Sequence, residues 1–396
     1  MKRTLETLEG QPLEGQRAFV RVDYNVPVRD GVVQDATRIT ASLPTIRWLR
    51  ERGCRVVLAS HLGRPKGTRK QEYSLHPVIA VLERELGTPV TFIDDPVSDD
   101  AVRATRRLTR GGVALLENTR FYPGEERNDA DLSDAFAQLG DLYVNDAFGS
   151  AHRAHASTEG VAHRLKPAVA GFLMARELEY LEGALQAPER PFVAILGGAK
   201  ISGKIDVIDA LVPKVDEILI GGAMACTFFA AQGLEMGDSL VERDRLDLAR
   251  GLLERAGNKL VLPRGVTIAE ALVEGASYRQ VPPHQVAPGW AVYDIDESTT
   301  QDFIRRITAA RTVVWNGPMG VFETPPFDAG TVAIARGMAQ AADAGATTIV
   351  GGGDSVSALQ RTGLTERMTH VSTGGGASLE LLEGKELPGV AALDDA

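Results

Sequence analysis

The chain has 396 residues and a formal net charge of −10, and 44% of its residues are hydrophobic. This length exceeds one ordinary hydrophobic core and favours two domains, while the acidic balance argues against nucleic-acid binding through bulk charge. Cys54 and Cys226 are the only cysteines, which excludes a disulfide framework and a cysteine-rich metal site. Acidic residues near the start, and no apolar run long enough to cross a membrane, predict a cytoplasmic protein without a membrane partner.

Short apolar runs recur through the first half of the chain at the spacing of β-α units. They alternate with segments of helical apolar spacing, such as 39–51 and 76–86, which predicts an open parallel α/β sheet. In such a sheet, ligands bind beyond the carboxyl ends of the strands. The expected strands are residues 18–22, 56–59, 90–93, 113–116 and 142–144.

Cationic side chains follow these expected strands at the ends where ligands should bind. Arg38 comes shortly after the first strand, and His61 and Arg64 follow the second. Arg120 and Arg153 follow two later strands. A single arginine in such a place is usually solvated or ion-paired, but arginines at four equivalent strand ends favour one shared anionic ligand.

Asp23 and Asn25 lie among these cations. A carboxylate and an amide suit the hydroxyl groups of a ligand, and the carboxylate can also hold arginine side chains in place. A simple turn before Pro27 is the alternative explanation. The sequence is compatible with both.

Residues 156–190 have the apolar spacing of one long amphipathic helix that ends near Pro188. No Ser- or Gly-rich linker separates the two halves of the chain. We therefore expect two domains joined by a long helix that can carry a hinge.

An apolar run at 192–196 breaks into glycines and then into Lys200 and Lys204, before an expected helix at 205–211. Glycines let backbone N–H groups approach a phosphate, and the helix N-terminus and the lysines add positive charge. The pattern satisfies the first seven positions of a P-loop, but Ile205 stands where Ser or Thr would bind Mg²⁺. It therefore predicts a polyphosphate site outside the ordinary P-loop enzymes, with a Gly-rich turn and surface lysines as the alternative.

Further expected strands, at 217–220, 312–315 and 347–350, also end in glycines, and residues 370–379 place three glycines and a serine before a helix. Glycines at successive strand ends let the backbone approach a ligand from several sides, although a tight turn explains any single one. None of these segments fits the dinucleotide-binding pattern G-x-G-x-x-G.

Asp354 follows three glycines and opens an expected helix. Its carboxylate can cap the helix N-terminus or reach a Mg²⁺ ion that bridges phosphates. Because Ile205 supplies no hydroxyl, Asp354 is the best-placed metal ligand. Glu323 is a candidate for ribose hydroxyls, with a solvated surface glutamate as the alternative.

A series of motifs, in order along the whole chain, resembles those of the phosphoglycerate kinase family. They are Arg21-Val-Asp-Tyr-Asn-Val-Pro27, Ser60-His-Leu-Gly-Arg-Pro65, Leu116-Glu-Asn-Thr-Arg-Phe121, Val144-Asn-Asp-Ala-Phe-Gly149, Gly197-Gly-Ala-Lys200, Trp315-Asn-Gly-Pro-Met-Gly-Val-Phe-Glu323, Gly351-Gly-Gly-Asp354 and Ser372-Thr-Gly-Gly-Gly-Ala-Ser-Leu-Glu380. The resemblance implies two Rossmann-like, three-layer α/β/α domains with parallel sheets. Residues 1–170 with the tail 378–396 would bind phosphoglycerate, and residues 171–377 would bind the nucleotide.

The resemblance also implies reversible phosphoryl transfer from 1,3-bisphosphoglycerate to MgADP, giving 3-phosphoglycerate and MgATP. It assigns phosphoglycerate binding to Asp23, Tyr24, Asn25, Arg38, His61, Leu62, Gly63, Arg64, Arg120 and Arg153. It assigns nucleotide binding to Gly198, Lys200, Lys204, Gly222, Asn316, Pro318, Glu323, Gly351, Gly352, Gly353, Asp354 and Ser355, with Mg²⁺ on Asp354. Arg38, Lys200 and Gly375 would meet the transferring phosphoryl group. Tyr24 stands where the family more often has Phe, which should be harmless if its ring packs and its hydroxyl reaches water.

This reaction needs no catalytic base, because the nucleophile in the ATP-consuming direction is a carboxylate that is already ionised at neutral pH. Catalysis would come from in-line positioning and charge stabilisation, in a site that excludes water only when the domains close. Two rival interpretations are another P-loop-like NTPase and a non-enzymatic sugar-phosphate receptor. Ile205 and the arginines argue against the first, and the paired lysines and the lack of an export signal argue against the second. We further expect a monomer.

Overall fold

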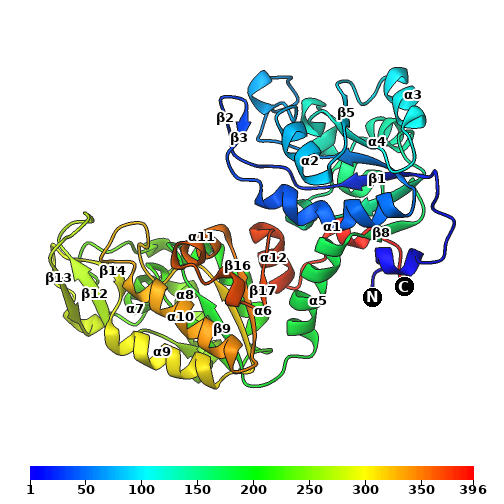
Figure 1. Cartoon of the computed structure of the whole chain (residues 1–396). Helices are drawn as coiled ribbons and strands as arrows, with labels where there is room; N and C mark the ends of the chain where they lie inside the picture. The colour runs from blue at the N-terminus through cyan, green and yellow to red at the C-terminus, as the bar shows by residue number, and fades with distance from the viewer. The chain divides into compact units, whose positions relative to one another are not determined.

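The computed structural model describes all 396 residues, and the chain divides into two compact units. The first unit comprises Met1–Glu179 with Glu386–Ala396, and the second comprises Tyr180–Lys385. The division falls inside helix α5 (Phe172–Gln186), which is green in Figure 1.

The first unit is built on a six-stranded sheet with the order β5-β6-β4-β1-β7-β8, in which every neighbouring pair is parallel. Its central strands are buried along almost their whole length, as the apolar runs predicted. In chain order the strands are β1 (Arg17–Arg21), β4 (Arg55–Ala59), β5 (Val90–Ile93), β6 (Val113–Leu116), β7 (Leu142–Asn145) and β8 (Ala168–Ala170).

A small antiparallel hairpin and several helices complete the first unit. The hairpin strands are β2 (Val28–Arg29) and β3 (Val32–Val33). The helices are α1 (Thr37–Glu51), α2 (Val78–Leu86), α3 (Asp99–Arg107), α4 (Ala130–Ala137) and α13 (Pro388–Ala391).

Several of these helices begin and end at residues that satisfy their free backbone groups. The Ser98 hydroxyl accepts a hydrogen bond from the Ala101 N–H at the start of α3, and the Asp129 carboxylate accepts one from the Leu132 N–H at the start of α4. Helix α2 ends at Gly87, whose φ of 62° is left-handed. The helix ends are therefore fixed locally, by sequence.

The second unit has its own six-stranded parallel sheet, with the order β11-β10-β9-β15-β16-β17. Its strands are β9 (Phe192–Leu196), β10 (Glu217–Ile220), β11 (Leu260–Val261), β15 (Thr312–Asn316), β16 (Thr347–Gly351) and β17 (His370–Val371). An antiparallel sheet with the order β13-β12-β14 is appended to it, with β12 (Val266–Ala269), β13 (Tyr278–Val281) and β14 (Ala291–Ile295). The helices are α6 (Ile205–Leu211), α7 (Met224–Ala231), α8 (Leu246–Ala256), α9 (Glu297–Ala309), α10 (Ala329–Asp343), α11 (Gly353–Thr362) and α12 (Gly375–Leu382).

Both parallel sheets contain a point where the direction of winding reverses. In the first unit the chain builds outward from β1 through β4 and later returns to β7 on the other side of β1. In the second it builds outward from β9 through β10 to β11 and returns to β15 on the other side of β9. Ligands of open α/β sheets bind beyond the strand ends at such switch points. The segments after β1, β7, β9 and β15 are therefore where sites are expected.

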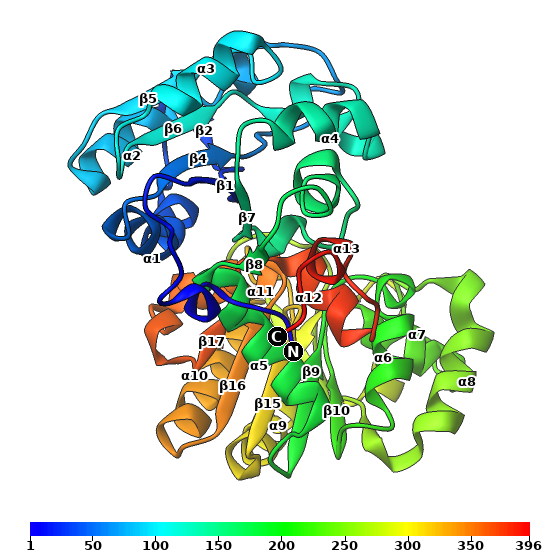
Figure 2. The same ribbon diagram turned by 90° about the vertical axis from the view of Figure 1, so that its right-hand side faces the viewer.

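The two ends of the chain lie together in the first unit (Figure 2). The Lys2 amine is 2.9 Å from an Asp395 carboxylate oxygen, and strand β7 is tied to the C-terminal segment by the Asn145 side-chain amide, which donates to the Gly389 carbonyl at 2.9 Å. The C-terminal segment thus packs beside the last residue of a central strand.

The single helix expected over 156–190 is wrong in its first half. This stretch contains a π-helical turn at Ala156–Gly160, then strand β8, and only then helix α5. Proline lacks an N–H group and disfavours the helical conformation in the residue before it, so Lys166 and Pro167 interrupt the helix. The residues after the proline pair with β7 instead.

The first unit extends past the expected bound of 170 to Glu179, and the second extends past 377 to Lys385. The start of α5 belongs to the first unit, because the Phe172 N–H donates to the Thr45 hydroxyl at 2.9 Å and the Phe172 ring meets the edge of Trp48 at 6.2 Å. Helix α12 belongs to the second unit, where it contacts α6.

Candidate active site

The strand ends of the first unit bring cationic side chains together. His61 is only 5% exposed, and burial is the main cause that holds the pKa of its imidazole well below the ordinary value. The positive charges of Arg21, Arg120 and Arg38, together with His155, add to this shift. His61 is therefore a neutral imidazole within a cluster of guanidinium groups.

Arg153 belongs to the same cluster. Burial lowers the pKa of the Arg120 guanidinium; Glu126 opposes this effect, whereas the charge of Arg153 contributes to it. Arg153 itself is exposed, and its Nε donates to His152 Nε2 at 3.2 Å. Arg64 is exposed as well.

A network of hydrogen bonds orients the residues after β1 and β4. Arg38 Nη1 lies 3.1 Å from Asp23 Oδ2, so the carboxylate holds this guanidinium in place. Asn25 Oδ1 accepts from the Gly63 N–H at 2.9 Å, and Arg120 donates to the Gly63 carbonyl at 2.9 Å. At a φ of 62°, Gly63 has no room for a side chain, since a Cβ there would lie 2.4 Å from the Tyr73 ring.

Tyr24 and Leu62 are placed differently from the other predicted binding residues. The Tyr24 ring is fully buried, its hydroxyl lies 2.9 Å from the Ser42 hydroxyl, and burial raises its pKa. The condition that the ring packs is met, but the hydroxyl is paired with Ser42 and does not reach water. Leu62 is 5% exposed and belongs to the same hydrophobic core. Their side chains pack in the core, which leaves them only backbone groups to offer a ligand.

Arg21 was missed among the candidate residues because it ends strand β1 rather than following it. It is fully buried, donates to the Ser157 hydroxyl at 2.8 Å, and has Nη2 3.1 Å from His61 Nδ1. A guanidinium can only donate, so Nδ1 must accept and the imidazole proton lies on Nε2. Arg21 thereby makes His61 a neutral N–H donor. The signal in the sequence was an arginine closing an otherwise apolar run.

The glycines of the second unit have two different roles. Gly222 and Gly317 have positive φ values of 68° and 100°, and an added Cβ would lie 2.4 Å from the Gly198 carbonyl oxygen and 2.2 Å from that of Gly197, respectively. These glycines let the loops after β9, β10 and β15 pack against one another. By contrast, a Cβ on Gly198 or Gly353 would meet nothing within 4 Å. Gly198 and Gly353 therefore border open space.

Lys204 and Asn316 lie at the switch point of the second unit. The Lys204 amine bonds to Asn316 Oδ1, and burial lowers its pKa to about 8, against the opposing charges of Asp354 and Glu383. Asn316 is 3% exposed, and its Nδ2 has no hydrogen-bond partner. A buried donor without a partner is costly unless a ligand supplies the acceptor. Lys200 is exposed nearby in the chain, just before the 3₁₀ turn that leads to Lys204.

The loops after β15, β16 and β17 are joined by short contacts. The Ser355 hydroxyl is buried and accepts from the Gly317 N–H at 2.6 Å. A Cβ on Gly375, the first residue of α12, would lie 3.1 Å from Gly352 Cα. Pro318 is buried, and its carbonyl accepts from the Gly198 N–H. These contacts place Gly351, Gly352 and Gly353 against the N-terminus of α12.

Asp354 lies in the first turn of α11 and is exposed. It does not cap the helix, because the N-cap residue is Gly352 and no side chain caps that end. Capping is therefore the wrong explanation for this carboxylate. Glu323 is exposed in the loop before α10.

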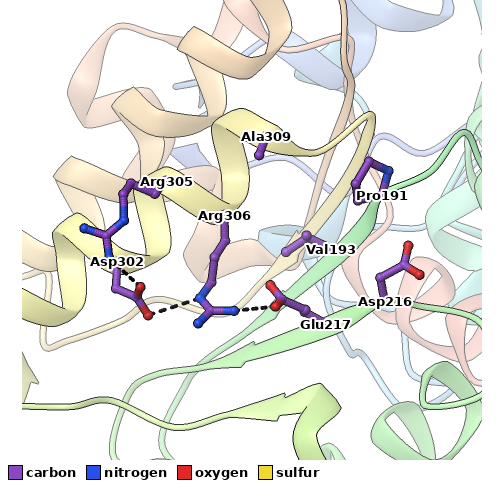
Figure 3. A pocket seen from close by; sticks show the side chains of 8 residues that line it. All are labelled: Pro191, Val193, Asp216, Glu217, Asp302, Arg305, Arg306 and Ala309. Carbon is purple, nitrogen blue, oxygen red and sulfur yellow. Dashed lines mark hydrogen bonds and ion pairs between the residues drawn. The ribbon is translucent and has the colours of Figure 1, made fainter.

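A pocket on the second unit lies at the opposite ends of its strands (Figure 3). It is lined by residues at or before the starts of β9 and β10 and by residues of α9, namely Pro191, Val193, Asp216, Glu217, Asp302, Arg305, Arg306 and Ala309. Its charges satisfy one another: Asp302 accepts from Arg305 at 2.7 Å and from Arg306 at 3.1 Å, and Arg306 also pairs with Glu217. This paired cluster is separate from the expected site.

Two kinds of feature are absent from the structure. No helix of the structure is long and apolar enough to span a bilayer. No three His, Cys, Asp or Glu side chains gather in a way that could hold a metal ion.

The chain thus has two parallel α/β units. One carries a guanidinium cluster, and the other carries a lysine among closely packed glycine loops, an arrangement that fits a phosphotransferase. The sequence model of the family described as phosphoglycerate kinase matches residues 8–385. The chain is 52% identical to the cytosolic phosphoglycerate kinase of Nicotiana tabacum over the full length of both. It is 55% identical to the phosphoglycerate kinase of Rubrobacter xylanophilus over all of this chain and 98% of the relative. The solved phosphoglycerate kinase of Coxiella burnetii superposes with a TM-score of 0.90 at 39% identity, over 99% of this chain and 98% of that one.

The chain belongs to the phosphoglycerate kinase family. It is a glycolytic phosphotransferase that transfers a phosphoryl group between 1,3-bisphosphoglycerate and ADP, giving 3-phosphoglycerate and ATP. The family, the α/β fold with parallel sheets and the reaction predicted from the motifs are thus confirmed, and both rival interpretations are set aside.

Proposed function

We propose that the first unit binds the phosphoglycerate and the second unit binds MgADP or MgATP. The observation that carries this assignment is the difference in charge chemistry between the switch points. Guanidinium groups gather around His61 in the first unit, whereas Lys204 and the unsatisfied Asn316 amide lie among glycines in the second. Arginine clusters suit a compact anion with several oxygens, and backbone-lined loops suit a polyphosphate.

In the first unit, the residues divide between the hydroxyl and the anionic groups of the ligand. Asp23 and Asn25 would accept from the glycerate hydroxyl, while Asp23 keeps Arg38 in place. His61 would donate through Nε2, since Arg21 occupies Nδ1. The anionic groups would be bound by Arg38, Arg64, Arg120 and Arg153, with backbone groups from Tyr24, Leu62 and Gly63 closing the site.

In the second unit, Lys204, Asn316 and the open positions Gly198 and Gly353 would contact phosphates, and Glu323 the ribose. The Asp354 carboxylate fits a Mg²⁺ ligand, because it is exposed and does not cap its helix. Mg²⁺ commonly binds one or two carboxylates and completes its shell with phosphates and water, in agreement with the absence of a larger acidic cluster. When bound, the ion would neutralise charge on the phosphates. Gly222, Pro318, Gly351, Gly352 and Ser355 shape this site through the loop contacts described above.

We assign the transferring phosphoryl group to Arg38, Lys200 and the N-terminus of α12 at Gly375. No residue needs to remove a proton, since the attacking carboxylate is already ionised. Each positioned charge of this kind typically contributes on the order of 3 kcal/mol in a site without water. The two bound substrates must come within reach of each other for an in-line transfer, so we propose that closure is part of the cycle.

We also propose that the protein is a cytoplasmic monomer that uses neither nucleic acid nor membrane as a partner. The net charge of −10 and the cytosolic location printed for the Nicotiana tabacum relative support this proposal. Light scattering coupled to size exclusion should give a mass near that of one 42.4 kDa chain. A mass twice as large would contradict it.

A coupled assay with 3-phosphoglycerate and ATP, run with Mg²⁺ and with a chelator, tests the assignment of substrates and metal. We expect saturable turnover with Mg²⁺ and its loss with the chelator. Isothermal titration of 3-phosphoglycerate should give one site, which Arg120→Ala weakens without changing ADP binding. If Arg120→Ala weakens ADP instead, the two units have been assigned the wrong way round.

A further inference from the structure

The loop between β15 and α10, residues 317–328, has no regular secondary structure, yet it carries Pro318 and Glu323 of the proposed nucleotide site. We call it the nucleotide loop. A loop that presents binding groups must be held by its surroundings, because an unsupported segment of this length samples many conformations. The residues that hold it determine how well the site is formed before the nucleotide arrives.

One such support is Asp294, on strand β14. It is 3% exposed, its Oδ2 accepts from the Gly330 N–H at 2.7 Å, and its Oδ1 accepts from the Ile295 N–H at 2.8 Å. An added Cβ on Gly320 would lie 2.3 Å from Oδ1, and one on Gly330 would lie 2.4 Å from it. The carboxyl group therefore occupies a space that a glycine of the loop and a glycine of α10 leave open for it.

Further contacts hold the nucleotide loop between β14 and the start of α10. The Thr331 hydroxyl, in the first turn of α10, accepts from the Met319 N–H at 3.0 Å. The Val321 N–H donates to the Tyr293 carbonyl at 2.9 Å, and the rings of Tyr293 and Phe327 lie 5.0 Å apart. Asp294 is the group that ties α10 to β14, so the position of Thr331 depends on it.

We propose that Asp294 is a positioning residue for the nucleotide, which acts by locking the start of α10 onto β14 and thereby fixing the loop that presents Glu323. This inference rests on the proposed nucleotide site. Asp294 accepts from Gly330 and Ile295, and it lies outside every motif that identified the family. Its effect reaches the nucleotide through Gly330, Thr331 and the backbone of the loop.

The chemistry of Asp294 favours a geometric role over a stabilising one. No cation pairs with its carboxyl group; burial raises its pKa to about 8, and Asp328 contributes to that rise. Burying a carboxyl group without a partner cation costs free energy that an apolar side chain would not. An apolar side chain, however, could not accept the hydrogen bonds from the Gly330 and Ile295 N–H groups.

The test compares the two substrates in Asp294→Ala and Asp294→Asn. We expect Asp294→Ala to raise KM for ATP and Kd for ADP by about tenfold, because small misplacements of binding groups have large effects. KM for 3-phosphoglycerate should stay unchanged. Asp294→Asn keeps the shape of the side chain and one acceptor oxygen. Its KM for ATP should therefore lie between those of the unmodified protein and Asp294→Ala. Hydrogen exchange should quicken in residues 317–328 of the Ala variant before other parts of the unit.

Two matched controls separate positioning from general loss of stability. Asp302→Ala removes another buried carboxylate of the same unit, in the paired cluster at the opposite strand ends, and should lower the melting temperature without changing KM for ATP. Thr331→Val removes the acceptor for Met319 while leaving Asp294 in place, and should raise KM for ATP. Thr331→Ser should restore it. If Asp294→Ala does not fold, the two Thr331 variants still show whether the start of α10 positions the nucleotide loop.

Glu323→Ala is the reference variant, because it removes a proposed nucleotide contact directly. If folded Asp294→Ala, or Thr331→Val in its place, raises both KM values equally or leaves KM for ATP unchanged, Asp294 only stabilises the core and the inference is overturned. If Glu323→Ala weakens ADP binding in that case, the proposed nucleotide site stands and only the positioning role fails. If Glu323→Ala also has no effect, the assignment of Glu323 to the nucleotide fails with it.

Discussion

The switch points of the two units offer different chemical groups to a ligand. In the first unit, the groups offered to a ligand are side chains, and a buried layer of polar residues holds them in place: Arg21 orients His61, and Asp23 orients Arg38. In the second unit, glycines recur where the strands end, and backbone atoms lie where side chains would otherwise be, as at Gly222 and Gly317.

This difference determines how each site can fail. A side-chain site loses function when one charge or one orienting hydrogen bond is removed, and the fold around it survives. A site of closely packed backbone fails when a side chain is added at a packed position such as Gly222 or Gly317, since the neighbouring loop leaves no space for it. Substitutions at the binding residues should therefore lower activity without lowering stability in the first unit. In the second unit, substitutions at the packed glycines should lower activity and stability together.

The largest expected effect is on turnover in Arg38→Ala. If Arg38 stabilises the transferring phosphoryl group, kcat should fall by about a hundredfold or more, which corresponds to roughly 3 kcal/mol, while Kd for ADP stays unchanged. The melting temperature should change little, because the side chain is 39% exposed. Steady-state kinetics and ADP titration check this.

The matched control is Arg29→Ala, which removes an arginine of the same unit whose side chain is 83% exposed on strand β2. It should behave as the unmodified protein. Equal losses of turnover and ADP affinity in Arg38→Ala would show that Arg38 does not act on the transferring group.

The second unit should respond most strongly to Gly317→Ala. The new Cβ would lie 2.2 Å from the Gly197 carbonyl oxygen at a φ of 100°, so strain and overpacking together should cost about 3 kcal/mol of unfolding free energy. Gly353→Ala is the matched change, because a Cβ there meets nothing within 4 Å. It should keep the stability and lose ADP affinity. Denaturant unfolding and ADP titration give both quantities, and equal stabilities of the two variants would contradict the division of glycine roles.

The strands, and the residues that follow them, could be predicted from sequence because each is a local pattern. Apolar runs define parallel strands, and the groups at their carboxyl ends follow from chain order. What could not be predicted depends on contacts between distant segments. Gly197 and Gly317 pack together across the switch point, and Asp294 fills a space between Gly320 and Gly330. The helix expected over 156–190 is wrong for a local reason, because Pro167 breaks the helical conformation there.

A smaller effect is expected for Asp354→Ala, which tests the metal. Loss of the carboxylate should weaken ADP binding in the presence of Mg²⁺ by about tenfold, a typical consequence of losing support for a metal, and leave the binding of free ADP unchanged. Asp244→Ala, an exposed carboxylate on the same unit, serves as the control. Titrations with and without Mg²⁺ that coincide for Asp354→Ala and the unmodified protein would place the metal elsewhere.

The smallest expected effect is a difference between the two substrates in the pH dependence of kcat/KM. Burial lowers the pKa of Lys204 to about 8, so kcat/KM for ATP, which reports groups of the free enzyme, should fall as the pH rises above 8. The value for 3-phosphoglycerate should stay level, since guanidinium groups keep their charge and His61 is already neutral. Lys204→Arg should move the fall beyond the measured range.

Unfolding cannot imitate this fall, because the sign of its pH dependence is opposite. Between about 8 and 10.5, the unfolded chain keeps a proton on Lys204 that the folded chain has lost, so this residue makes the folded state more stable as pH rises. Thermal unfolding measured across the same range separates the two effects. If kcat/KM falls equally for both substrates, or falls at the same pH in Lys204→Arg, the second unit does not depend on this amine and the contrast between the two sites is weaker than their charges suggest.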